Sequence, residues 1–191
     1  RTIYPYTYDQ RHQIITALDY RYGSGASYDG PRVGGKELFK NTGANLVANF
    51  ASGMPYSRQQ RITGASLITV PTPILDGEPL GSRKPWNFRA DLQVDKNITL
   101  EFGKGDTKKK TANLNIYILA TNVFNTLNIT DVYRATGNAG DDGYLNAARF
   151  QTSISTQNNE ESFRQYYAMK ANDPYNYGIP RQIRLGVKLD F

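Results

Sequence analysis

The sequence predicts an all-β protein: an antiparallel transmembrane β-barrel segment of about five long strands, with long loops and one short loop helix. Composition supports this first, because 14 Tyr, 8 Phe and 17 Gly among 191 residues favour strands and turns. The mean hydropathy is -0.59, and no apolar run approaches the ~18 residues that a membrane helix requires. Apolar and polar residues instead alternate over long stretches. Alternation keeps the average hydropathy low even when one face of a strand contacts lipid.

The longest alternating stretch is residues 86–102, which would extend about 56 Å at roughly 3.3 Å per residue. An ordinary globular strand has ~5 to 6 residues, whereas a tilted strand needs ~9 to 11 to cross the hydrocarbon core of a membrane. Only Lys96 interrupts the apolar side of the stretch. That side consists of Trp86, Phe88, Ala90, Leu92, Val94, Ile98, Leu100 and Phe102. Its length and two-sided pattern favour a membrane strand.

Four further strands are predicted by the same alternation. Residues 14–22 and 44–51 form the first two, and Ile15 is out of phase in the earlier one. Residues 113–124 form the next, and residues 175–191 form the last.

The connections between the predicted strands alternate in length. Residues 103–111 form a short polar turn, whereas residues 52–85 and 127–174 far exceed the usual ~4 to 6 residues. Long loops of outer-membrane barrels face outward and short turns face the periplasm. Residues 160–170 in the last loop predict a short helix, because acidic residues begin this segment and a lysine ends it.

Several short motifs, in a constant order, resemble one known family. They are DQRH at 9–12, SGMPYS at 52–57, ATNVFNTLN at 120–128, VYRATGNAGDDGYL at 132–145 and NDPYNYGIPRQIRLGVKLDF at 172–191. Together they resemble the C-terminal barrel of TonB-dependent outer-membrane receptors, and most closely the SusC-like branch. The resemblance implies that residues 1–191 are one C-terminal portion of a barrel of roughly 22 strands, whose plug domain and remaining strands are not in this chain.

The same resemblance implies a location and partners. It predicts the cell outer membrane, contact with outer-membrane lipid, and import of a nutrient such as a glycan or peptide fragment when the TonB machinery pulls on the plug. A SusD-like surface lipoprotein and the barrel-assembly machinery are further expected partners. The assembly signal would be the alternating apolar residues that lead to a terminal aromatic residue. Its members are Tyr177, Leu185, Leu189 and Phe191.

Two groups of residues are candidates for function. The polar sides of the strands would line the lumen and either pair with one another or hold the plug. These lumen candidates are Asp19, Arg21, Arg89, Asp91, Gln93, Asp95, Arg184 and Lys188. Aromatic residues in the loops would stack on a sugar or peptide, although packing against a neighbouring lipoprotein lid explains them equally well. The loop candidates are Tyr56, Tyr133, Tyr144, Phe163, Tyr166 and Tyr167.

The sequence gives little support for catalysis, metal binding or nucleic-acid binding. We expect no catalytic residues and no cofactor, because the chain has no cysteine, a single histidine at His12 and no GxSxG nucleophile motif. Asp141 and Asp142, with glycines nearby, form a weak Ca²⁺ candidate, and a tight turn is the preferred interpretation. The net charge of +6, from 23 basic and 17 acidic residues, is too dilute to require nucleic acid.

Two alternative functions remain open. A barrel of the same family could serve as a non-transporting subunit of an outer-membrane complex. A soluble β-sandwich carbohydrate-binding module would instead cover its apolar stripes with a second sheet. Leu92, Val94, Leu185 and Val187 distinguish the sandwich, because they would be covered in it and bare on a barrel wall.

Overall fold

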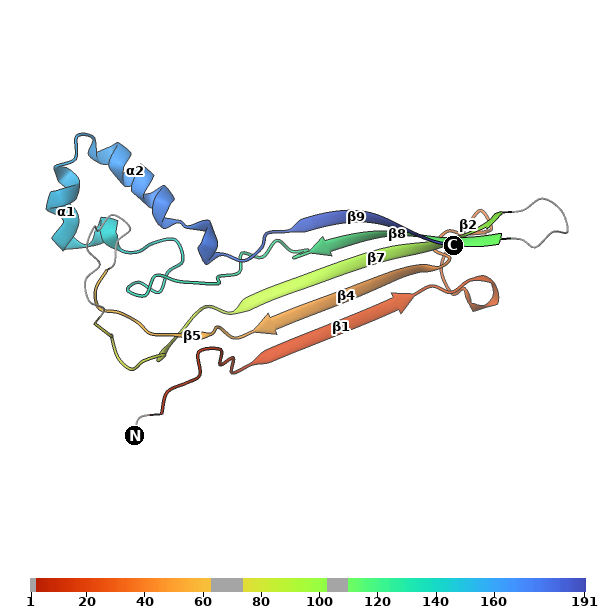
Figure 1. Cartoon of the computed structure of the whole chain (residues 1–191), viewed down its shortest axis with the longest axis horizontal. Coiled ribbons are helices and arrows are strands. Elements are labelled where there is room, and N and C mark those ends of the chain that lie inside the picture. The colour runs from red at the N-terminus through yellow and green to blue at the C-terminus, as the bar shows by residue number, and fades with distance from the viewer. Residues whose placement is uncertain (1–2, 63–73, 103–109) are drawn as a thin grey trace. The chain divides into compact units, whose positions relative to one another are not determined.

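The computed structural model describes residues 3–62, 74–102 and 110–191, which form two compact units (Figure 1). The sheet unit comprises Ile14–Asn49, Phe88–Thr126 and Ile179–Phe191. The loop unit comprises Arg1–Gln13, Phe50–Asn87 and Leu127–Gly178. No helix in the described part of the chain is long and apolar enough to cross a membrane.

One large antiparallel sheet dominates the sheet unit. Its strands are β1 (Gln13–Arg21), β4 (Thr42–Ala51), β7 (Asn87–Phe102), β8 (Lys110–Thr121) and β9 (Gln182–Asp190). They are hydrogen-bonded in the order β1-β4-β7-β8-β9, so strands that follow one another in the chain lie side by side (Figure 1). The prediction of a mostly β chain with five long strands is confirmed for the described residues.

The register of β7, β8 and β9 sorts their side chains onto two faces. Directly opposed residues of an antiparallel pair point to the same side of the sheet. Val94 lies opposite Ile118, which in turn lies opposite Leu185. The apolar face therefore carries Leu92, Val94, Lys96, Ile98, Leu100, Phe102, Lys110, Ala112, Leu114, Ile116, Ile118, Ala120, Ile183, Leu185, Val187 and Leu189. The polar face carries Gln93, Asp95, Asn97, Thr99, Glu101, Thr111, Asn113, Asn115, Tyr117, Leu119, Thr121, Gln182, Arg184, Gly186, Lys188 and Asp190.

Two strands have other bounds than the sequence predicts. The last strand begins at Gln182, because Pro174–Asn176 forms a 3-10 turn whose start is capped by the Asp173 side chain, an acceptor from Tyr175 N at 3.0 Å. A proline also lacks the backbone N–H that a strand interior donates. β8 ends at Thr121, and the next residue, Asn122, has a positive φ of 52°. The predicted extension of this strand to residue 124 is therefore wrong.

A short hairpin interrupts the connection between β1 and β4. It pairs β2 (Arg32–Val33) with β3 (Lys36–Glu37). Gly34 and Gly35 join the strands with φ of 58° and 76°, which suits the type I′ turn that two-residue hairpins favour. The predicted turn at 103–111 lies mostly outside the described residues.

The described residues of the loop unit form two α-helices, so the prediction of one short loop helix is wrong. The predicted helix is present as α2 (Glu160–Ala171), with Asn159 capping its start through Ser162 N at 3.0 Å. The second helix, α1 (Ala148–Ser155), has no side-chain cap, no acidic residue in its first turn and no basic residue in its last. Sequence signals of a helix end are therefore missing from it. The unit also pairs β5 (Pro55–Tyr56) with β6 (Ser82–Arg83).

Candidate functional site

The apolar face of the sheet unit is open to its surroundings. Leu185 is 72% exposed and Val187 is 63% exposed on β9, and Ile118 on β8 is 48% exposed. Besides the large sheet, the described residues form only two-stranded sheets. The covering sheet that a β-sandwich requires over Leu92, Val94, Leu185 and Val187 is therefore absent from the described structure.

Aromatic side chains gather near strand ends. In the sheet unit, Phe88 and Phe124 lie with ring centroids 5.8 Å apart, and Tyr22 lies 5.0 Å from Tyr20 and 5.8 Å from Phe39. These contacts lie at opposite ends of the strands, because β1 and β7 run in the same direction on either side of antiparallel β4, and Phe88 begins β7 while Tyr22 follows the end of β1. Both ends of the long strands therefore carry aromatic side chains that contact one another.

In the loop unit, the Trp86 ring is stacked between two others. Phe50 lies 4.8 Å from it and His12 lies 5.8 Å from it, both nearly parallel. The His12 backbone also exchanges hydrogen bonds with Ser52, donating to Oγ at 3.1 Å and accepting from its N–H at 2.8 Å. His12 thus has a structural position at the start of β1.

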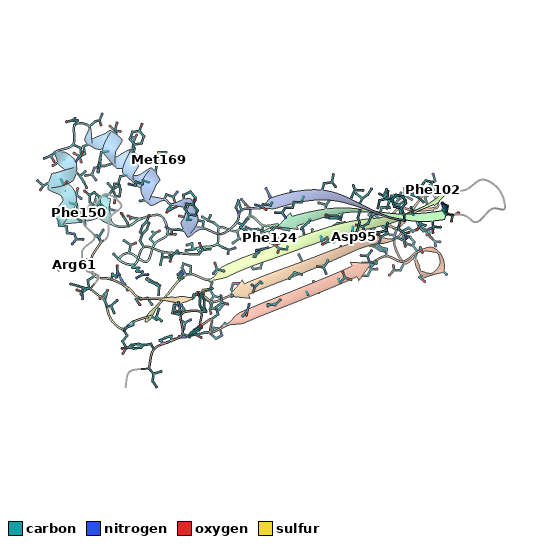
Figure 2. The ribbon with its side chains drawn as sticks, in the orientation of Figure 1. Arg61, Asp95, Phe102, Phe124, Phe150 and Met169 are labelled. Atoms are coloured by element: carbon teal, nitrogen blue, oxygen red, sulfur yellow. The ribbon has the colours of Figure 1, made fainter. Side chains whose placement is uncertain are left out.

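A charged cluster lies at the centre of the polar face. Arg21 donates to Asp95 twice, from Nη1 to Oδ2 at 3.0 Å and from Nη2 to Oδ1 at 2.8 Å. Such a two-point contact is the strongest geometry for an arginine and a carboxylate. The Asp95 side chain, labelled in Figure 2, is only 11% exposed. Asn115 Nδ2 also donates to Asp95 Oδ2, at 3.2 Å.

A glycine lets this ion pair form. Gly43 lies on β4, the strand between β1 and β7. A methyl group at position 43 would lie 2.5 Å from Arg21 Nη2 and 3.0 Å from Asp95 Oδ1. The guanidinium therefore crosses β4 over the bare backbone of Gly43. The same device recurs at Gly186, where a methyl group would lie 2.2 Å from Cζ of Tyr117 on the neighbouring strand.

The predicted lumen candidates lie on the polar face, and most are paired there. Arg89 binds Asp91 through two hydrogen bonds of 2.9 and 2.7 Å. Asn45 donates to Asp19 at 3.3 Å, Arg184 to Gln182 at 3.1 Å, and Lys188 lies 3.2 Å from Asp190. Gln93 is exposed on the same face. Sequence alternation identified these residues, whereas it missed Gly43 and Asn115, whose roles depend on other strands. The sequence did contain one signal for Gly43, because a glycine inside a predicted strand often marks a place where another group approaches the backbone closely.

Two of the loop candidates form the core of the loop unit. Tyr144 is 5% exposed and Tyr167 is 4% exposed, and their rings are stacked 4.7 Å apart. Tyr144 also stacks on Phe150 at 4.3 Å, and Ile154 is fully buried beside them. The rings of Tyr144 and Tyr167 are therefore occupied by protein, and the structure does not present them for stacking on a ligand.

The other loop candidates differ in exposure. Tyr166 is 73% exposed on α2, next to the equally exposed Met169 that Figure 2 labels. Phe163 packs against the core and Tyr56 is half-buried in β5. Tyr133 donates its hydroxyl to the Ala171 carbonyl at 2.7 Å. Burial, together with the negative charges of Asp142 and Asp173, raises the pKa of Tyr133 above its ordinary value.

The acidic pair Asp141 and Asp142 forms a turn. Asp142 is 2% exposed and accepts from Tyr144 N at 2.9 Å and from the Tyr167 hydroxyl at 2.6 Å. Asp141 accepts from Gly143 N at 2.7 Å, and Gly143 has a φ of 84°. Among the described residues no group of three or more His, Cys, Asp or Glu side chains is arranged for a metal ion.

A second ion pair links two segments of the loop unit. Lys84 Nζ lies 3.0 Å from Asp131 Oδ1 and donates to the Thr130 carbonyl at 2.6 Å. Partial burial alone would raise the pKa of Asp131, but hydrogen bonds from Lys84 and from Val132 N outweigh it, and the pKa is lowered.

No family model, curated protein or solved structure matches the chain.

Proposed function

We propose that the chain is part of the wall of an outer-membrane transporter similar to the TonB-dependent, SusC-like receptors, and that the whole protein imports a glycan or peptide fragment. The observation that carries the proposal is the register of β7, β8 and β9, which gathers exposed apolar side chains on one face and polar ones on the other. The apolar face would contact lipid and the polar face a water-filled lumen. The resemblance of the motifs supports the same assignment.

The exposed apolar face supports contact with a membrane. Large exposed apolar patches mark surfaces that bind membranes or other proteins. The strands are long enough, since β1 and β9 have 9 residues each and β7 has 16, against the ~9 to 11 that a tilted strand requires. Two lysines interrupt the apolar face. The charged end of each would have to extend to the membrane–water interface or to a polar partner.

The sheet requires further strands in this proposal. β1 and β9 are its outermost strands among the described residues. Unpaired amides at such edges would be too costly in hydrocarbon, where no water can satisfy them. We therefore propose that these edges pair with the rest of a barrel of roughly 22 strands that holds a plug. The TonB machinery, a SusD-like lipoprotein and the barrel-assembly machinery would be its partners.

Adjacent residues on β9 provide a test of the membrane assignment. The chain has no cysteine, so a single cysteine introduced here carries a label at a known position. Leu185→Cys and Arg184→Cys, made in the whole protein in its own cells, place the label on the apolar and polar faces respectively. We expect a fluorescent label at 185 to be quenched by brominated lipid and one at 184 by aqueous iodide. Val187→Cys and Lys188→Cys form a second matched pair.

The opposite result would overturn the proposal. If labels at 185 and 187 were quenched by iodide as strongly as labels at 184 and 188, the apolar face would not contact lipid. Transport requires a separate measurement, growth of a strain lacking the gene on neutral oligosaccharides or on oligopeptides as the sole carbon source. We expect growth on one class to be lost. Unchanged growth with lipid quenching intact would favour a non-transporting barrel.

A further inference from the structure

The apolar face contains two lysines that differ in their surroundings. Lys96 lies in the middle of β7, opposite Ile116, and its Nζ donates a hydrogen bond to the Leu38 carbonyl. Lys110 lies at the start of β8, opposite Phe102. Its side chain makes no hydrogen bond or ion pair with any residue that the structure describes. One lysine is thus satisfied by the protein, and the other lacks a partner within the described chain.

Lys110 borders a hollow of about 550 Å³. The other residues that line it are Phe102, Thr111, Ala112 and Phe191. Ala112 is 2% exposed, while Phe102 and Phe191 are largely exposed. Phe102 marks the end of β7 in Figure 2. The hollow therefore combines an apolar floor, two aromatic side chains and one cation.

We propose that this hollow binds a glycerophospholipid, with the lipid phosphate on Lys110 Nζ and the glycerol and upper acyl carbons between Phe102 and Phe191. Charge complementarity argues for this occupant, because a lysine on an apolar face that has no partner among the described residues needs an anion that is itself attached to an apolar body. A lysine at a membrane interface reaches toward the headgroups in this way. The proposal rests on the proposed function, since it requires lipid on the apolar face.

The position of the hollow also suits a membrane interface. It lies at the end of the sheet where β7 passes into β8, and these are joined by the shortest connection between the long strands. Short connections of outer-membrane barrels face the periplasm. The ligand would therefore be a lipid of the periplasmic leaflet. Lys96 would need no lipid there, because the Leu38 carbonyl already accepts its hydrogen bond.

Lipid binding by the whole purified protein tests the proposal. After delipidation in detergent, binding of phosphatidylglycerol, phosphatidylcholine and inorganic phosphate would be compared by native mass spectrometry. We expect phosphatidylglycerol to bind, and Lys110→Gln to weaken it about fivefold, since a lysine near an anionic headgroup contributes on that order. Lys110→Arg should keep the affinity. The control Lys188→Gln removes an exposed lysine from the polar face and should change nothing.

Three outcomes would overturn the lipid site. They are equal effects of Lys110→Gln and Lys188→Gln, unchanged binding after Lys110→Gln, or displacement of phosphatidylglycerol by inorganic phosphate, which would indicate a free-phosphate site. Phe102→Ala should weaken both lipids alike and leave inorganic phosphate unaffected. If the label at 185 is quenched by brominated lipid while Lys110→Gln has no effect, only this site fails. If the label at 185 is also accessible to iodide, the membrane assignment fails as well.

Discussion

The two units of the chain bury their apolar residues in different ways. The loop unit has a core of its own, in which Tyr144, Ile154, Tyr167 and Ala171 pack together and exclude water. Among the described residues, the long strands of the sheet unit form no equivalent core, because one face is apolar and exposed while the other holds ion pairs. The difference teaches that the loop unit covers its apolar side chains with its own residues, whereas the apolar face of the sheet unit stays exposed in the described chain and, in the proposed function, is covered by lipid.

The prediction with the largest expected effect concerns the core of the loop unit. Ile154 is completely buried, so Ile154→Ala should lower the free energy of unfolding of this unit by about 2 to 5 kcal/mol through lost burial and the cavity left behind. Limited proteolysis of the folded protein would measure this loss of stability as faster cleavage within residues 127–174. Leu185→Ala is the control in the sheet unit. If both variants are cleaved at the wild-type rate, Ile154 does not hold a water-excluded core.

The second prediction tests the apolar face of the sheet unit. Leu92→Arg should impair assembly into the membrane, because a lipid-facing arginine at mid-depth costs about 2 to 4 kcal/mol. Resistance of the folded protein to heat and detergent on a gel would report the loss. Gln93→Arg, on the polar face of the same strand, should assemble normally. Equal behaviour of the two variants would remove the distinction between the faces.

The third prediction concerns the cluster of the polar face. Gly43→Ala places a methyl group 2.5 Å from Arg21 Nη2, so the guanidinium must move away from Asp95. Overpacking of this kind typically costs about 1 to 3 kcal/mol. The midpoint of unfolding in denaturant would measure the cost. Ala48→Gly, also on β4, removes a methyl group without affecting the ion pair and is the comparison. A midpoint unchanged by Gly43→Ala would show that Arg21 does not depend on this crossing.

The smallest expected effect concerns pH in the loop unit. The pKa of Asp131 is lowered in the folded chain, so its contribution to stability is present above the ordinary carboxyl pKa and is lost as pH falls through the folded value. The Asp131 side chain is 67% exposed, which limits the effect to about 0 to 1 kcal/mol. Protease susceptibility of the loop unit at pH 7 and pH 3 would measure it. Asp131→Asn should reduce this pH difference, and Glu161→Asn at an exposed helix position should not.

Much of the sheet could be predicted from sequence, and less of the loop unit. Residues 86–102 alternate so regularly that β7 appears almost as expected, from Asn87 to Phe102. The segment of α2 carries acidic residues at its start and a lysine at its end, as a helix favours, and that helix is present. The uncapped α1 gives no such signal. The aromatic residues of the last loop looked alike in sequence, and only packing separates buried Tyr167 from exposed Tyr166.

The sequence by itself determined most of the residues of the long strands, although not the end of β8 or the start of β9, and which of them share a face, because side chains of a strand alternate with a period of two and this geometry is local. The tertiary structure alone decided which residues meet across strands. Arg21 reaches Asp95, 74 positions away, because Gly43 lies between them without a side chain. Such a contact depends on the order of strands in the sheet, and the period of a single strand carries no information about its neighbours.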